Sequence, residues 1–160
     1  MLVYLCGAIE YSPDHGKAWR GEITPFLLAL GHDVYDPALD EKKTLSDEEV
    51  QDFRKWKDSN LLRFQGTVRK IIDYDLDWIE RKCDYIVAFW DEYAGRGAGS
   101  QGELTLAYRR GIPVYLVSAV PVSQISGWIL GCATEVFRDF DSLKRHLTMK
   151  FAADALTLVE

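Results

Sequence analysis

The sequence predicts an α/β protein with a doubly wound, five-stranded parallel sheet. Two observations support this prediction: short continuous apolar runs recur along the chain, and segments with helical periodicity separate them. Continuous apolar runs are typical of strands buried on both faces, and the helices between them supply the crossovers of a parallel sheet. Right-handed crossovers favour the strand order 2-1-3-4-5, with helices on both faces, in a single domain over residues 1–160.

Five short runs are the expected strands, namely Leu2–Cys6, Asp33–Tyr35, Tyr85–Phe89, Val114–Val117 and Glu135–Phe137. The apolar spacing predicts helices over residues 17–30, 46–56, 61–82, 100–110 and 142–150, with a short connecting segment at 128–130. Pro25 lies inside the first helix and is expected to kink it or to force a local rearrangement. In the long helix the expected buried stripe consists of Leu61, Phe64, Val68, Ile71 or Ile72, Leu76 and Ile79.

Composition narrows the class of partner and the cellular setting. Apolar residues make up 48% of the 160 residues and charged residues 28%, which is ordinary for a soluble globular protein. The net charge of −6 argues against nucleic acid as a partner, and no apolar run is long enough to indicate a membrane partner. The cysteines at 6, 83 and 132 are odd in number, and the chain opens directly on a strand, so we expect a reduced, cytoplasmic protein.

A glycine-rich loop, residues 95–103, joins the third expected strand to the helix that follows it. Its glycines permit a sharp turn and close approach of a ligand, and the start of the helix offers unpaired N–H groups. In a doubly wound fold this loop and the long loop at residues 7–16 both emerge at the switch point where ligands bind. The alternative is a capping box, in which Ser100 and Glu103 only cap the helix.

Glu103 and Asp75 are candidate carboxylates for a displacement at a glycosidic bond. In such a reaction one carboxylate attacks the anomeric carbon while the other protonates the leaving group, and retaining enzymes place the two about 5–5.5 Å apart. The loop and helix start favour an ionised Glu103 as the nucleophile. Asp75 lies about 12 Å along its helix from Cys83, comparable to the climb of the third strand, so we expect it beside Glu103 with a raised pKa.

Alternatives remain open for each candidate. Asp75 is otherwise one acid on a solvated helix face, where Asp73 and Asp77 compete for its role but point nearly the opposite way. Tyr4 either orients Glu103 through its hydroxyl or is a core tyrosine. Trp19 and Trp90 stack on a flat ligand ring or belong to the core. His15 and His32 lack partners at metal-ligand spacing, so no metal is assigned.

The charge-rich residues 36–60 form either a solvated surface helix or a lid over the site. The surface helix would start at a capping box from Ser46 to Glu49.

Three motifs occur in order: Tyr4-Leu-Cys-Gly7 with its long loop, Asp75-Leu-Asp-Trp-Ile79 before Asp84-Tyr-Ile-Val87, and Gly99-Ser-Gln-Gly-Glu103 before Ala107. Together they resemble the nucleoside 2-deoxyribosyltransferase family, over roughly residues 2–147. The resemblance implies the doubly wound fold and cleavage of the N-glycosidic bond of a 2′-deoxynucleoside through a covalent deoxyribosyl-glutamate, followed by transfer of the sugar to another nucleobase. It implies no cofactor.

The resemblance also implies roles for individual residues. Glu103 would be the nucleophile, Asp75 the acid–base group at the nucleobase, and Tyr4 the orienting hydroxyl. The expected substrate-binding residues are Gly7, Ala8, Ile9, Trp19, Asp91, Gly99 and Ser100. The partners would be a nucleoside, a free nucleobase and further copies of the chain, as a dimer or a larger homo-oligomer in which a neighbouring subunit completes the pocket through Thr134 or Glu135.

Two departures from the family pattern bear on the substrate. Family transferases can carry an acid a few residues before the nucleophile, where this chain has Arg96-Gly-Ala-Gly99. Related 5′-monophosphate N-glycosidases place serine and arginine in the first loop, where this chain has Ala8-Ile-Glu10, and an acid there disfavours a phosphate unless Arg20 or Arg96 compensates. An N-glycoside hydrolase of nucleosides or nucleoside 5′-monophosphates, and a non-catalytic nucleotide-sensing module, are therefore the alternative functions.

Overall fold

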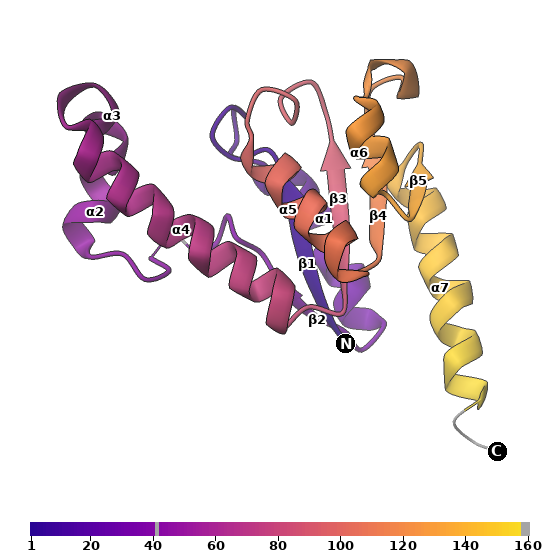
Figure 1. Cartoon of the computed structure of the whole chain (residues 1–160). Coiled ribbons are helices and arrows are strands. Elements are labelled where there is room, and N and C mark those ends of the chain that lie inside the picture. The colour runs from indigo at the N-terminus through magenta and orange to yellow at the C-terminus, as the bar shows by residue number, and fades with distance from the viewer. Residues whose placement is uncertain (41, 158–160) are drawn as a thin grey trace.

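The five strands form one parallel sheet in the order β2-β1-β3-β4-β5, which confirms the predicted fold class (Figure 1). The structure, a computed structural model, describes residues 1–40 and 42–157. Residue 41 of the charge-rich segment and residues 158–160 of the expected domain lie outside the described residues. The strands are β1 (Leu2–Gly7), β2 (Asp33–Tyr35), β3 (Tyr85–Trp90), β4 (Val114–Ser118) and β5 (Glu135–Phe137).

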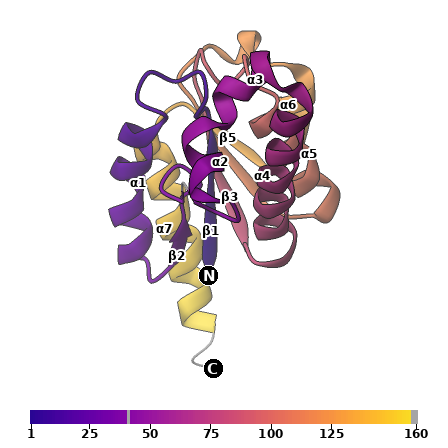
Figure 2. The ribbon, with the colours of Figure 1, turned by 90° about the vertical axis from the view of Figure 1, so that its left-hand side faces the viewer.

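Helices cover both faces of the sheet, as Figure 2 shows by turning the molecule through 90°. On one face lie α1 (Lys17–Ala29) and α7 (Phe140–Thr157), and on the other α4 (Leu61–Arg81), α5 (Gly99–Arg110) and α6 (Gly127–Cys132). The remaining short helices are α2 (Asp47–Asp52), η1 (Phe53–Lys55), α3 (Trp56–Ser59) and η2 (Val122–Gln124). The expected helix over 46–56 is thus divided into three short pieces.

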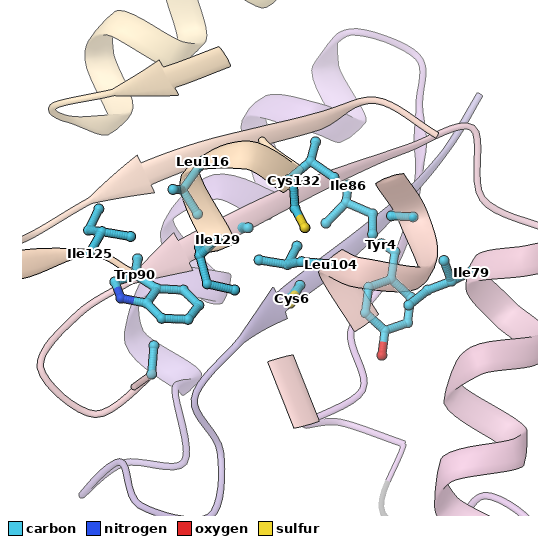
Figure 3. Packing of buried hydrophobic residues seen from close by; sticks show 14 of the residues in the cluster. Tyr4, Cys6, Ile79, Ile86, Trp90, Leu104, Leu116, Ile125, Ile129 and Cys132 are labelled. Atoms are coloured by element: carbon cyan, nitrogen blue, oxygen red, sulfur yellow. The ribbon is translucent and has the colours of Figure 1, made fainter. Parts of the chain in front are cut away.

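Alternation along β1 distributes its side chains between two apolar cores. Val3 and Leu5 pack with α1 and α7, whereas Tyr4 and Cys6 pack with α4, α5 and α6. The second of these cores is drawn in Figure 3, where Tyr4 lies beside Ile79 of α4 with its hydroxyl pointing away from the labelled aliphatic side chains. The same face therefore holds the expected catalytic tyrosine and the helices that carry the two candidate carboxylates.

Local sequence signals explain several boundaries. Ser46 and Glu49 form the predicted capping box at the start of α2, each side chain bonding the other residue's backbone N–H.

α1 runs unbroken through Pro25. The carbonyl that loses its partner there belongs to Gly21, an exposed residue, so water can satisfy it.

The expected buried stripe of α4 is partly wrong. Leu61 is exposed, and of the two alternatives Ile71 is partly buried and Ile72 is exposed. The buried residues of the helix are Thr67, Asp75 and Ile79. The reason lies in the arrangement of the helix, whose first half extends beyond the sheet and packs against the short helices η1 and α3, with ion pairs to α2 (Figure 1). Without a sheet beneath them, apolar side chains at the start of α4 have no core to enter.

Candidate active site

Glu103 in the first part of α5 is held by a tyrosine from β1, an inner strand of the sheet. The fully buried Tyr4 donates its hydroxyl proton to Oε1 of Glu103 across 3.0 Å. Burial raises the pKa of Tyr4 well above its usual value, and the charge of Glu103 adds to the effect, so the hydroxyl stays protonated and donates. Burial likewise raises the pKa of the Cys6 thiol, which lies beside Glu103 and is neutral.

Glu103 does not serve as a helix cap. The residue at the cap position of α5 is Ala98, and no side chain bonds the free N–H groups there. Ser100 lies inside the first turn, and its carbonyl faces the Cys6 sulfur at 3.9 Å. The capping-box interpretation of Ser100 and Glu103 is therefore wrong, because the carboxylate turns toward the sheet and Tyr4 instead.

Asp75 is the buried acid of α4, as expected, and the solvated-face alternative is wrong. Burial raises its pKa from 3.8 to about 6, and the negative charge of Glu103 also raises it, which places the two carboxylates in one electrostatic environment. Asp73 is exposed, and Asp77 pairs with Arg81 at 2.7 Å on the outer side of the helix. Asp75 alone among the three is buried.

Lys43 is a member of this site that sequence analysis did not predict. Its ammonium group pairs with Oδ1 of Asp75, and both side chains are almost wholly buried, with 8% and 12% of their surface exposed. Lys43 lies in the segment between β2 and α2, which is rich in charged residues of both signs. No sequence signal distinguishes it from its neighbour Lys42, which is 70% exposed and pairs with Asp47.

Arg20 of α1 organises the first loop and is not available to bind a phosphate, contrary to one expectation. Its side chain is fully buried, and its Nε lies 3.3 Å from Asp36. Its two terminal nitrogens donate to the backbone carbonyls of Leu5, Gly7, Ala8, His15 and Gly16. The other arginine considered for that role, Arg96, is exposed with its guanidinium over the Tyr93 ring.

The expected substrate-binding residues fall into two groups. Gly7 ends β1 beside Phe89, and Ala8 and Ile9 begin the first loop, whose carbonyls bond Arg20 and His15. Gly99 and Ser100 begin α5. These residues lie at the carboxyl end of the strands, on the elements that also carry Tyr4 and Glu103.

Trp19 and Asp91 lie elsewhere. Trp19 is buried on the opposite face of the sheet against Phe89 and Phe140, and the Asp91 carboxylate accepts the N–H groups of Tyr93 and Ala94 at 2.9 Å. Both line a hollow of about 700 Å³ between α1, the ends of β3 and β4, and the start of α7. Tyr4, Asp75 and Glu103 do not line it, so the structure does not bring Trp19 and Asp91 to the carboxylates. Trp90 belongs to the core on the other face, near Ile125 and Ile129 (Figure 3).

Thr134 and Glu135, the candidates for completing a neighbour's pocket, lie at the amino end of the strands. The Thr134 hydroxyl accepts the N–H of Val114 at 2.9 Å, and Glu135 lies 3.3 Å from His146. They are therefore at the end of the sheet opposite the first loop and the glycine-rich loop.

No group of three or more His, Cys, Asp or Glu side chains among residues 1–40 and 42–157 is arranged to hold a metal ion. In the same part of the chain, no helix has the length and apolarity needed to cross a membrane.

The fold is shared with two solved enzymes. No protein-family model and no curated protein matches the chain by sequence. The structure is similar to a 2-deoxyribosyltransferase from the psychrotolerant bacterium Bacillus psychrosaccharolyticus, with 19% identity, 90% of each chain covered and a TM-score of 0.56. It is also similar to a CMP N-glycosidase from Clostridium botulinum, with 16% identity, 94% of this chain and 99% of that chain covered, and a TM-score of 0.55. The likeness establishes the fold, and both neighbours are of the kinds that the sequence motifs resemble.

Proposed function

We propose that this chain is an enzyme that cleaves the N-glycosidic bond of nucleosides and transfers a 2-deoxyribosyl group between nucleobases. The observation that supports the proposal most directly is a glutamate held by a buried tyrosine hydroxyl, in the electrostatic environment of a buried aspartate with a raised pKa. Two neighbouring carboxylates, one of them with a raised pKa, are the groups that a double displacement at an anomeric carbon requires.

In the first half of the reaction, a Glu103 carboxylate oxygen attacks C1′ and the C1′–N bond breaks. The bonding electrons leave with the nucleobase, which takes a proton from Asp75. In the second half, a nitrogen of the incoming nucleobase attacks C1′, Asp75 accepts the proton lost by that nitrogen, and the ester to Glu103 breaks. Tyr4 orients Glu103 in both halves.

The environment of Asp75 suits this exchange of roles. With a pKa of about 6, roughly a tenth of the aspartates carry a proton at pH 7. The protonated fraction can donate to a leaving base, while the ionised fraction can accept from an incoming one. An exposed aspartate at its usual pKa of 3.8 would have almost no protonated form at neutral pH.

Hydrolysis is the second candidate, and the likeness to the CMP N-glycosidase favours it. The same two carboxylates would act, with water taking the place of the second base. A 5′-phosphate is the less favourable substrate feature here, because Arg20 is committed to backbone carbonyls and Glu10 adds a negative charge to the first loop.

The test is to incubate the protein with 2′-deoxynucleosides or nucleoside 5′-monophosphates, with and without a second free base, and to separate the products. Transfer predicts a new nucleoside only when the second base is present, whereas hydrolysis predicts free sugar in both cases. Glu103→Gln should abolish turnover, and mass spectrometry of quenched wild-type protein should find a deoxyribosyl adduct on Glu103. Ligand binding without turnover by the wild-type protein would instead support the sensing module.

Oligomeric assembly is part of the proposal. We expect a dimer or a larger homo-oligomer in which a neighbouring copy closes the site near the carboxylates. Light scattering at assay concentrations measures the assembly. A monomer that turns over nucleosides would refute this part while leaving the chemistry intact.

A further inference from the structure

Lys43 is the ionic partner of Asp75 in the structure. Burial of its ammonium group would be costly without such an anionic partner. The ammonium group has lost nearly all its water, because only 8% of the side chain is exposed. A buried lysine is stable as a cation only where an anion and hydrogen bonds replace that water. The Asp75 carboxylate supplies this replacement at Oδ1.

The backbone around Lys43 is shaped to present it to Asp75. Lys43 has a φ of 42°, a left-handed backbone conformation that few residues other than glycine adopt. Its N–H donates to Oδ1 of Asp40 at 3.1 Å, and Oδ2 of Asp40 accepts the hydroxyls of Tyr35 at 3.1 Å and Tyr74 at 2.9 Å. Asp40 thereby ties the loop to β2 and α4, on either side of the site.

Several charged and titratable groups face Asp75 from the elements around it. Glu103 of α5 and Asp40 of the loop are acidic and oppose its ionisation, while Lys43 favours it. The hydroxyls of Tyr35 from β2 and Tyr4 from β1 complete the surroundings, and the pKa of each is raised chiefly by burial and further by the charge of Asp75. Lys43 is therefore the cation that lowers the pKa of Asp75, against the effects of burial and of two neighbouring carboxylates, which raise it.

We propose that Lys43 is a positioning residue for Asp75, which fixes the direction of its carboxylate and keeps it able to both give and take a proton near neutral pH. This inference rests on the proposed function. Without the ammonium group, burial and the neighbouring acids would hold Asp75 in its protonated form, which can assist a leaving base but cannot accept the proton of an incoming one.

The test uses Lys43→Met, which keeps most of the length of the side chain but not the charge, and Lys43→Arg, which keeps the charge. Lys42→Met is the matched control, because Lys42 is the adjacent lysine with its own aspartate partner at the surface. Carbon-13 NMR of the aspartate carboxyl groups gives the titration midpoint of Asp75 in each protein, with Asp75→Asn to identify the signal. We expect the midpoint to rise by about one unit or more in Lys43→Met and to stay near the wild-type value in the other two.

Kinetics provide the second readout. The alkaline limb of kcat/KM for a 2′-deoxynucleoside should move to higher pH in Lys43→Met, and Lys43→Arg should restore it. A nucleoside with a 7-methylated, positively charged purine needs no proton to leave, so its cleavage rate should change far less in Lys43→Met. A merely structural role for Lys43 would slow both substrates equally.

The outcomes separate the two proposals. A wild-type protein that turns over nucleosides, with an unchanged Asp75 midpoint in Lys43→Met, overturns the role of Lys43 alone. A midpoint shift in a protein that turns over no nucleoside overturns the proposed function and leaves the coupling of Lys43 to Asp75 standing. Thermal melts check each variant, and if Lys43→Met does not fold, Lys43→Gln gives the same uncharged comparison.

Discussion

The Tyr4 hydroxyl lies 3.0 Å from Oε1 of Glu103, although 99 positions separate the two residues in the sequence. The contact joins β1, an inner strand of the sheet, to the helix after the glycine-rich loop. Because Tyr4 is held in place by burial in the core, its hydroxyl has a fixed direction. The hydrogen bond from this hydroxyl therefore orients the Glu103 carboxylate. The core therefore supports the position of the proposed nucleophile.

Replacing Tyr4 by phenylalanine tests this relationship. Tyr4→Phe keeps the ring and removes the donor, so the Glu103 carboxylate loses a hydrogen bond to a charged group, worth about 1.5–3 kcal/mol. We expect kcat to fall by about tenfold to a hundredfold with little change in KM, because the bond orients the nucleophile rather than the substrate. Steady-state kinetics measure both constants. Tyr115→Phe, a buried tyrosine on the opposite face, is the control and should leave kcat unchanged.

The raised pKa of Asp75 predicts a specific dependence of stability on pH. Its value is about 6 in the folded protein and near 3.8 in the unfolded chain, so between these values the folded state binds more protons. The free energy of unfolding should therefore fall as pH rises from 4 to 6, by up to about 3 kcal/mol from this group. Urea denaturation of wild type and Asp75→Asn isolates the contribution of Asp75. The difference in the free energy of unfolding between the two proteins should change between pH 4 and 6 and be constant above pH 7. A constant difference from pH 4 to 7 would contradict the burial of an ionisable Asp75.

Much of the fold follows from local sequence patterns. Three continuous apolar runs predicted β1, β3 and β4, because strands buried on both faces must be apolar throughout. Right-handed crossovers predicted the strand order. The burial of Asp75 was also predictable, since helical geometry turns Asp73 and Asp77 away from the face that Asp75 shares with Ile79. These inferences need only the residues within one element or the length of adjacent elements.

The features that sequence analysis missed depend on contacts between distant segments. Lys43 meets Asp75 across 32 positions and through a left-handed turn, and nothing in the local pattern separates it from Lys42. Trp19 was expected to stack on a ligand ring and Asp91 to bind substrate, but both line a hollow on the face of α1 and α7. Leu61 was expected in the core because helical spacing does not show where the sheet beneath a helix ends.

The capping box of α2 predicts a modest loss of stability. In Ser46→Ala the backbone N–H of Glu49 loses its acceptor at the helix start, so we expect the free energy of unfolding to fall by about 1 kcal/mol. Ser59→Ala is the control, because the Ser59 hydroxyl only bonds a carbonyl that the helix turn already positions. Urea denaturation compares the two, and an equal effect of both substitutions would contradict a capping role for Ser46.

Gly16 provides the sharpest test of how the first loop is built. It has a φ of 69°, and a Cβ placed there would overlap the guanidinium of Arg20 and lie 2.5 Å from the carbonyl oxygen of Ala8. Gly16→Ala should therefore displace Arg20 from the carbonyls that it binds and lower stability by more than about 2 kcal/mol. Gly21→Ala is the matched control: it lies in α1 with no atom near its Cβ position, so an alanine there should stabilise the helix by about 0.5–1 kcal/mol. Thermal melts give both changes, and because the loop begins next to Tyr4 and Cys6, nucleoside cleavage should fall in Gly16→Ala and persist in Gly21→Ala.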